Sequence, residues 1–312
     1  MTTESKETSK INKNQQIEEN FLQMDDQKQS SDSRIMKFWQ RIPLLIRATI
    51  LGVFVSMIGI YSWIIPAYSI PAPWPFFIIG AILLIYWKYF SGSWWSESTK
   101  KTRIEYSRSK KISAPVLKWS LLAAIIFVII AQSSLVVTFR IIPFPAEAFT
   151  SGNRYLNTKP VWLAWVIIGI NSLVAGICEE TGIRGYTQVP VEKRYGPIVG
   201  ISFSSILFLI IHINQAWFLP IAIQGFCLGM ILGILAYTSD SLKPGIIAHS
   251  VMDVINFSYW WSDIAGRFEG RPIAETGIDL FFIISIVILV SSILLFIWTN
   301  RKIMAARNDS SL

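Results

Sequence analysis

The sequence is short of charged residues and of cysteine. Only 15% of its 312 residues are charged, whereas 52% are hydrophobic. Soluble domains carry about 25% charged residues, so the composition argues against a water-soluble protein. The two cysteines, Cys178 and Cys227, both stand inside apolar runs. They exclude a disulfide framework and a CxxC metal pair, and we interpret them as small buried side chains.

Three familiar sequence signals are also missing. The chain contains no HExxH motif, which is the helical signature of many zinc proteases. It contains no internal repeat and no pair of interrupted apolar segments, which are typical of secondary transporters. Its first residues hold no short apolar core after a brief basic start, so we predict no signal peptide there.

The net charge of +8 raises the question of nucleic-acid binding. The basic residues, however, cluster beside long apolar segments, which is typical of a protein that lies in a lipid bilayer. We therefore predict the bilayer as the partner of these residues and no nucleic acid. If the N-terminus is inside, Lys and Arg are in excess in the inner connections, so both termini are predicted to be cytoplasmic.

Long apolar runs dominate the rest of the chain. A membrane span needs about 20 apolar residues to cross about 30 Å of hydrocarbon, and its backbone groups must be satisfied internally, which favours helices. The sequence therefore predicts an all-α, polytopic membrane helix bundle of about eight transmembrane helices with a buried polar site. The predicted spans are 43–65, 70–90, 118–139, 161–189, 197–214, 217–238, 243–261 and 277–299.

The composition divides the chain into three parts. Residues 1–41 are polar and rich in Gln, Asn, Ser, Lys and Glu, which predicts a disordered cytosolic tail. Residues 42–300 form the predicted transmembrane helical domain, and residues 301–312 form a short cytosolic tail. We expect an integral, multi-pass protein of a bacterial cell membrane, or of the endoplasmic reticulum if the source is eukaryotic.

A few ionisable residues interrupt the apolar segments. Each costs about 2.5–3.5 kcal/mol at the centre of a membrane, so such residues usually mark a functional site. We predict that they converge around one polar cavity, where they partly offset one another's cost. These residues are Glu179, Glu180, Arg184, His212, His249 and Asp253.

Spacing relates several of these residues to one another. Glu180 and Arg184 are four residues apart, as are His249 and Asp253, so each pair shares one face of a helix. The first pair is expected to form an ion pair. Glu179 is rotated by about 100° from Glu180 and faces elsewhere.

Three motifs follow one another on successive apolar segments. The stretch "EETGIR" reads as EExxxR, "FLIIH" (Phe208 to His212) as FxxxH, and "HSVMD" as HxxxD. In this order they resemble the CAAX prenyl endopeptidase and bacteriocin-processing (CPBP) family of intramembrane proteases. The resemblance covers about residues 118–262, which we take as the protease core, and we interpret Phe208 as a packing residue.

The resemblance implies roles for the first two motifs. Glu179 corresponds to the principal catalytic carboxylate. Glu180 and Arg184 complete the first motif as an orienting pair, and His212 assists in activating water.

The resemblance also implies that His249 and the residue four positions later stabilise the developing oxyanion or bind the substrate. Some family members have Asn at that later position, whereas this chain has Asp253. An ionised Asp cannot donate a hydrogen bond. An oxyanion role for Asp253 therefore requires its protonation, and the alternative is that it orients His249.

The cofactor is open at this stage. Two histidines and carboxylates suit Zn²⁺, and the family has been interpreted both as metalloproteases and as metal-free glutamate proteases. We favour no cofactor. If zinc is present, its expected ligands are Glu179, His212 and His249.

The sequence thus predicts a CAAX-protease-like intramembrane endopeptidase. It would use Glu/His-activated water to hydrolyse a peptide bond of a membrane-associated protein or peptide. Two alternatives are a proton-coupled membrane transporter, in which buried Glu and His form a relay, and a non-catalytic immunity or scaffold membrane protein.

Overall fold

The computed structural model describes residue 34 and residues 37–143, 154–212, 219–260, 262, 264–266 and 269–309. All regular elements within these residues are helices, and none of these residues is in a strand. The chain is an all-α membrane helix bundle, as predicted. It divides into two units, residues 1–47 and residues 48–312, which are described separately.

The first unit holds the whole of the predicted disordered tail, residues 1–41. Residues 1–33, 35 and 36 of that tail lie outside the described residues. Residues 37–41, in contrast, are helical, and a further helix begins at Leu44. The backbone N–H of Arg47 donates to the carbonyl of Pro43 at 3.1 Å, which closes the first turn there.

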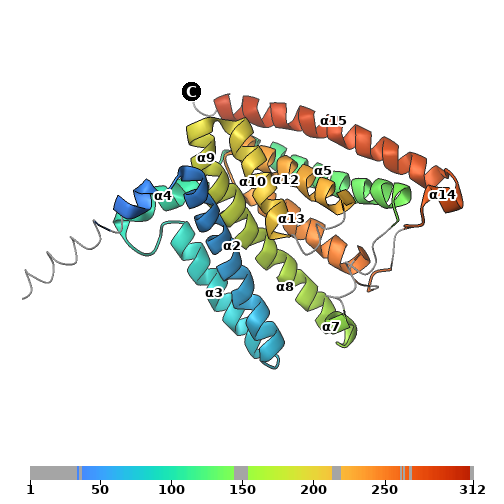
Figure 1. Cartoon of the computed structure of the whole chain (residues 1–312), viewed down its shortest axis with the longest axis horizontal. Helices are drawn as coiled ribbons and strands as arrows, with labels where there is room; N and C mark the ends of the chain where they lie inside the picture. Colours follow the sequence, from blue (N-terminus) through green and yellow to red (C-terminus); the bar gives the residue numbers. More distant parts are fainter. Residues whose placement is uncertain are drawn as a thin grey trace, which may run out of the picture. The chain divides into compact units, whose positions relative to one another are not determined.

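The second unit contains the remainder of α2 and all later helices (Figure 1). Several begin with Pro in the first turn, where its missing N–H costs nothing. The described elements are α2 (Leu44–Ser69), α3 (Trp74–Phe90), α4 (Glu97–Tyr106), α5 (Ala114–Ile141), α7 (Arg154–Asn157), α8 (Val161–Glu179), η1 (Glu180–Thr187), α9 (Gln188–Tyr195), α10 (Pro197–Ile211), α12 (Leu219–Ser239), α13 (Lys243–Ile255), η2 (Asn256–Trp260), α14 (Ile273–Thr276) and α15 (Leu280–Asp309).

Five of the described helices are long and apolar enough to cross a membrane, which makes this an integral, multi-pass protein. Each of the eight predicted spans corresponds to a helix, but the described residues do not confirm a count of eight spanning helices. The five are Leu44–Ser69, Ala114–Ile141, Val161–Tyr195, Ala222–Ser239 and Leu280–Asp309.

Two of the other three predicted spans are shorter helices. α3 and α10 have 17 and 15 residues. At a rise of about 1.5 Å per residue they measure roughly 23–26 Å, less than the hydrocarbon thickness of about 30 Å. α13 has 13 residues but continues directly into η2, so residues 243–260 are helical throughout. His212 caps α10, although the sequence had placed it within a longer helix.

The helix that carries the first motif changes its winding at that motif. It runs from Val161 to Tyr195, but residues 180–187 form the π-helix η1. Pro190 lies just beyond, in the first turn of α9. In a regular α-helix its ring would press on the carbonyl of Tyr186, so the widened turn before it relieves that clash. The helix therefore passes through Pro190 and turns back only at Gly196, whose φ of +88° suits glycine.

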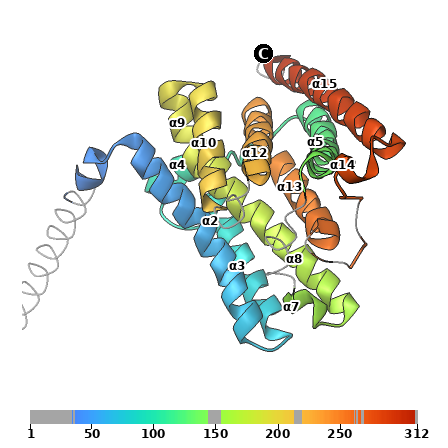
Figure 2. The ribbon, with the colours of Figure 1, turned by 45° about the vertical axis from the view of Figure 1, so that its right-hand side comes forward.

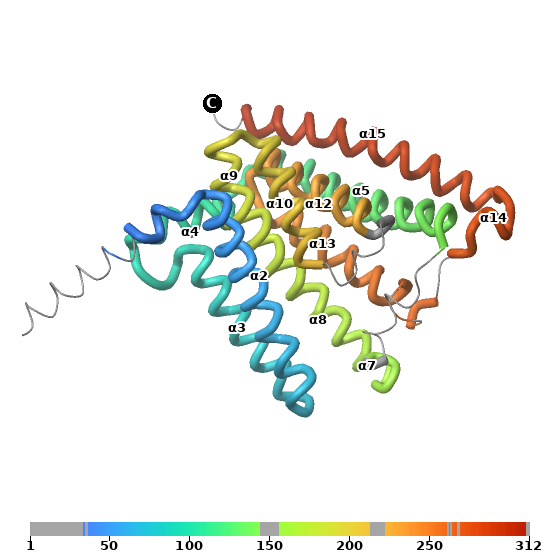
Figure 3. The backbone as a smooth tube through the Cα atoms, in the orientation of Figure 1, coloured from blue at the N-terminus to red at the C-terminus, as the bar shows by residue number. Residues whose placement is uncertain are grey.

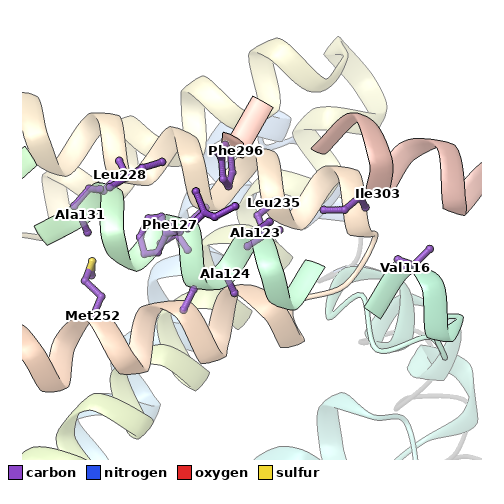
Figure 4. Close-up of a cluster of buried hydrophobic side chains, with 14 residues drawn as sticks. Val116, Ala123, Ala124, Phe127, Ala131, Leu228, Leu235, Met252, Phe296 and Ile303 are labelled. Atoms are coloured by element: carbon purple, nitrogen blue, oxygen red, sulfur yellow. The ribbon is translucent and has the colours of Figure 1, made fainter. Parts of the chain in front are cut away.

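Two of the apolar clusters of the second unit join most of its long helices. The larger joins α5, α12, α13 and α15, where Phe127 and Leu235 are fully buried and Met252 and Phe296 pack around them (Figure 4). The smaller joins α2 and α3 to α8 and η1. In Figures 2 and 3 α2 lies beside α3, and α15 runs along α5. α8, α10 and α13 lie between these pairs and carry the polar motifs.

The basic segment after α3 does more than mark orientation. Arg103 of α4 is buried and donates to the carbonyls of Tyr89 (2.5 Å) and Trp94 (2.5 Å). The buried Arg108 forms ion pairs with Glu192 at 2.7 Å and Asp240 at 3.1 Å. Both arginines therefore fix α4 and the chain after it against the bundle.

Candidate active site

The first motif lies where α8 becomes η1. Glu179 is the last residue of α8, and Glu180 is the first residue of η1. π-helical turns are rare and are frequently found at functional sites. Glu179 and Glu180 are consecutive residues, so their side chains are rotated by about 100° about the helix axis and face different partners.

Glu180 and Arg184 form the ion pair expected from their spacing. Glu180 Oε1 lies 3.3 Å from Arg184 Nη1, and both side chains are fully buried. Arg184 Nη2 also donates to the carbonyl of Gly229 on α12 at 3.3 Å. Its guanidinium carbon lies 4.4 Å from the ring centroid of Phe208. Arg184 thus links η1 to both α10 and α12.

His249 on α13 connects the three carboxylates. Its Nδ1 lies 2.9 Å from Glu180 Oε1, a hydrogen bond between buried groups. Its Nε2 lies 3.8 Å from Glu179 Oε2 and 3.6 Å from Asp253 Oδ2. The imidazole is therefore fixed by Glu180 on one side and faces two carboxylates on the other.

His212 completes the arrangement from the end of α10. Its Nδ1 lies 2.8 Å from the carbonyl oxygen of Phe208, and its Nε2 lies 3.7 Å from Glu179 Oε2. The side chain is 34% exposed, in contrast to the buried His249. His212 is thus the most exposed member of the site.

Phe208 packs between the charged groups, as its interpretation as a packing residue implied. Its ring centroid lies 4.6 Å from that of His212 and 5.8 Å from that of His249. Together with the contact to Arg184, this places one aromatic ring against three members of the site. Phe208 therefore restricts both imidazoles to a narrow range of orientations.

Two glycines allow the helices to approach the site. A Cβ on Gly245 would lie 3.1 Å from Glu180 Oε2, so this glycine lets α13 pass close to the buried carboxylate. A Cβ on Gly229 would lie 3.2 Å from the Cβ of Ser205. Because Gly229 has no side chain, α12 lies close to Ser205 of α10. Its carbonyl at this position accepts the hydrogen bond from Arg184.

Glu179 has the least satisfied side chain of the site. Its Oε2 is buried and has no hydrogen-bond partner, although two imidazole nitrogens lie within 4 Å of it. The second oxygen of Glu180 is also without a partner. Three carboxylates here share one permanently charged cation, so the charge balance depends on protons carried by the two histidines.

The donor types suit a zinc ion, but their spacing is wide. The set comprises Glu179 Oε2 and the Nε2 atoms of His212 and His249, and a second partner holds the other nitrogen of each ring, as in many zinc sites. Tetrahedral ligands at about 2.1 Å from zinc lie about 3.4 Å from one another. The separations here are 3.7 and 3.8 Å. Among the described residues, no group of three His, Cys, Asp or Glu has the geometry of a metal site.

The structure therefore brings all six sequence-predicted residues into one cluster built from α8, η1, α10 and α13. Residues 159–255 match the family model described as "Type II CAAX prenyl endopeptidase Rce1-like". This segment is Rce1-like. No curated protein and no solved structure matches the chain.

The Rce1-like segment begins at Lys159 and ends at Ile255, within the predicted core of residues 118–262. It contains the whole cluster, together with α12, which supplies the carbonyl that Arg184 binds. The match to this family supports, in general terms, a CAAX-type intramembrane protease that acts on a membrane-associated protein.

Sequence reasoning missed a row of polar residues next to the Rce1-like segment. Gln132 of α5 is hydrogen-bonded to Asn256, which directly follows the segment, and to Trp260. The only sign of them in the sequence is an amide within an otherwise apolar run.

Proposed function

We propose that this protein is an intramembrane endopeptidase in which Glu179 activates water to hydrolyse a peptide bond of a membrane-associated protein or peptide. The observation that carries the proposal is the free Oε2 of Glu179, which faces the Nε2 atoms of two histidines. A carboxylate without a partner can accept a proton from water. A water molecule hydrogen-bonded to this oxygen also reaches both imidazoles.

The outer partners of the imidazoles set their tautomers. The carbonyl of Phe208 can only accept, so His212 holds its proton on Nδ1. Glu180, paired with Arg184, accepts the Nδ1 proton of His249 in the same way. In their neutral forms both rings therefore present an acceptor nitrogen toward Glu179. A water between Glu179 and His212 can donate one hydrogen to each of them and keep a lone pair for attack.

The reaction then proceeds in two proton transfers. Glu179 takes one proton from the water as the oxygen bonds to the carbonyl carbon of the substrate. The tetrahedral intermediate collapses as the carbon–nitrogen bond breaks, and the proton passes from Glu179 to the leaving amine. His212, the more exposed ring, holds the water in line for attack.

His249 stabilises the negative charge that develops on the carbonyl oxygen of the substrate. In its protonated form it keeps the Nδ1 bond to Glu180 and presents a second N–H at Nε2, which can donate to the oxyanion. Asp253 Oδ2 lies 3.6 Å from this nitrogen and orients the ring. Asp253 thus acts through His249 and does not itself need to donate.

The substrate class follows from the family and from the position of the site. The Rce1-like description names CAAX prenyl endopeptidases, and such substrates carry a lipid near their C-terminus. A lipidated C-terminus reaches a site at membrane depth without a soluble docking domain. We therefore propose a lipidated C-terminal segment as the preferred substrate and a membrane-bound peptide precursor as the alternative.

Cleavage by the purified protein tests the proposal. In detergent micelles the wild type should cleave an internally quenched peptide that ends in S-farnesylated Cys-aliphatic-aliphatic-X. The His212→Ala variant should lower kcat by about 10²-fold or more, because the water loses its second partner. Absence of cleavage together with substrate-driven proton flux in liposomes would replace the protease by a transporter.

Zinc remains an alternative for the activation of water. Glu179, His212 and His249 would hold the ion, which would lower the pKa of its bound water toward neutrality. We propose the metal-independent reaction, because no group of three ligating side chains among the described residues has the geometry of a metal site.

Chelation separates the two reactions. Treatment with 1,10-phenanthroline followed by dialysis should leave kcat within about twofold of the untreated value. Metal content by mass spectrometry should show less than one zinc per chain, with no difference between the wild type and His212→Ala. Stoichiometric zinc that is lost in this variant, with activity restored by added Zn²⁺, would contradict the metal-independent reaction.

A further inference from the structure

A row of three polar side chains lies where α13 continues into η2. Its members are Gln132, Asn256 and Trp260. The indole N–H of Trp260 donates to Gln132 Oε1 at 3.2 Å. Gln132 Nε2 donates to Asn256 Oδ1 at 2.9 Å. Gln132 comes from α5, whereas Asn256 and Trp260 lie on η2. The row crosses an interface that is otherwise apolar.

The chemistry of these groups fixes the direction of both amides. A tryptophan N–H can only donate, so the oxygen of Gln132 must face Trp260. The nitrogen of Gln132 then faces Asn256, and the oxygen of Asn256 must face Gln132. The amide nitrogen of Asn256 is consequently turned away from α5. Its two N–H donors have no acceptor among the described residues.

The position of Asn256 relates these donors to the catalytic cluster. Asn256 follows His249 by seven residues, nearly two turns, so the two lie on about the same face of the helix. At about 1.5 Å per residue they are roughly 10 Å apart along the axis. An extended peptide rises about 3.3 Å per residue, so this distance corresponds to about three residues.

We propose that Asn256 binds a backbone carbonyl oxygen of the substrate peptide about three residues from the cleaved bond, and that Gln132 and Trp260 direct its amide toward the substrate. The inference rests on the proposed peptidase function. The separation of roughly 10 Å excludes contact with the oxyanion, so Asn256 is a substrate-binding residue. It contributes to ground state and transition state alike.

Kinetics of Asn256 variants test this role. Asn256→Asp keeps the acceptor for Gln132 but loses both donors, and Asn256→Leu loses them without adding charge. Both should raise KM for the farnesylated reporter about 3- to 10-fold, the effect of one lost hydrogen bond, with kcat within twofold. A merely structural role would lower the active fraction, and so the apparent kcat, with KM unchanged. That result would overturn the inference.

A change at Gln132 should have the same effect without touching Asn256. In Gln132→Glu the new carboxylate still accepts from Trp260 but cannot donate to Asn256. The Asn256 amide then reverses, its N–H donors turn to that carboxylate, and KM should rise as in Asn256→Asp. Gln224→Glu serves as a matched control, because Gln224 is a buried amide that binds Ser134 and not the row. It should leave KM unchanged.

Modified substrates locate the contact. Reporters in which single carbonyls are replaced by methylene groups should show one sensitive position, about three residues from the cleaved bond. There the modification should raise the wild-type KM by the same factor as Asn256→Asp, and the two effects should not add. Fully additive effects at every position would overturn the inference while cleavage itself upholds the proposed function. Failure of the wild type to cleave any reporter would overturn both.

Discussion

Replacing Glu179 with glutamine should reduce kcat by about 10²- to 10⁴-fold, the range that general-base catalysis contributes. Glutamine has nearly the same shape, but its amide cannot take a proton from water. The change also removes a buried carboxylate whose Oε2 has no hydrogen-bond partner, so the fold should be at least as stable as before. The measurements are kcat for the farnesylated reporter and the unfolding midpoint in detergent micelles.

The control for this variant is Glu275→Gln, which alters an exposed glutamate of α14. It should change neither kcat nor the midpoint. If Glu179→Gln retained more than a tenth of the wild-type kcat, Glu179 would not be the base. A lost activity accompanied by a lower unfolding midpoint would instead indicate a structural role.

The second large effect concerns the stability of the fold. Arg184→Met should lower the free energy of unfolding by about 3–5 kcal/mol, because it leaves Glu180 fully buried without its cation. The same change removes the hydrogen bond to Gly229 and the contact with Phe208. We therefore expect a lower unfolding midpoint even where methionine fills the space of the arginine side chain.

A second substitution should recover much of this loss. Glu180→Gln in the Arg184→Met background removes the unpaired charge, so the double variant should be more stable than Arg184→Met alone. Arg271→Met is the matched control, since Arg271 pairs with Glu269 at 2.9 Å on the exposed surface. It should leave the midpoint unchanged. Equal losses for Arg184→Met and Arg271→Met would show that burial of the pair does not matter.

These two predictions separate chemistry from stability within one short stretch of chain. Glu179 and Glu180 are neighbours in sequence, yet one has a free oxygen beside two imidazoles and the other is held by Arg184 and His249. Because consecutive residues of a helix are rotated by about 100°, the two side chains face different partners. Loss of Glu179 should therefore affect rate, and loss of the partner of Glu180 should affect folding.

Much of the fold was predictable because lipid imposes a simple rule. Long apolar runs must form helices, and each predicted span has a helix at its position. The lengths were less predictable. The span predicted at 161–189 runs on to Tyr195, whereas the span predicted at 197–214 yields a helix that ends at Ile211. The end of a helix depends on what its last turn meets inside the bundle, and hydrophobicity alone does not record this.

The site was predictable as a set of residues, because a charge in an apolar membrane segment is costly and therefore indicates a functional site. Their distances and roles were not. The spacing of Glu180 and Arg184 indicated their ion pair, whereas the bond between Glu180 and His249 joins residues 69 positions apart. Asn256 and Gln132 gave no comparable signal, since a single amide in an apolar run is common in membrane helices.

The sequence by itself determined that this chain is an all-α membrane protein and which six ionisable residues it carries into the bilayer. Only the tertiary structure decided that His249 binds the carboxylate paired with Arg184, and that Glu179 keeps an oxygen without a partner. It also decided which nitrogen of each histidine faces Glu179, and that Asn256 directs its donors away from α5. The physical reason is that composition and local spacing set the cost of burying each group, whereas the compensating partners lie on other helices and are fixed only when those helices pack.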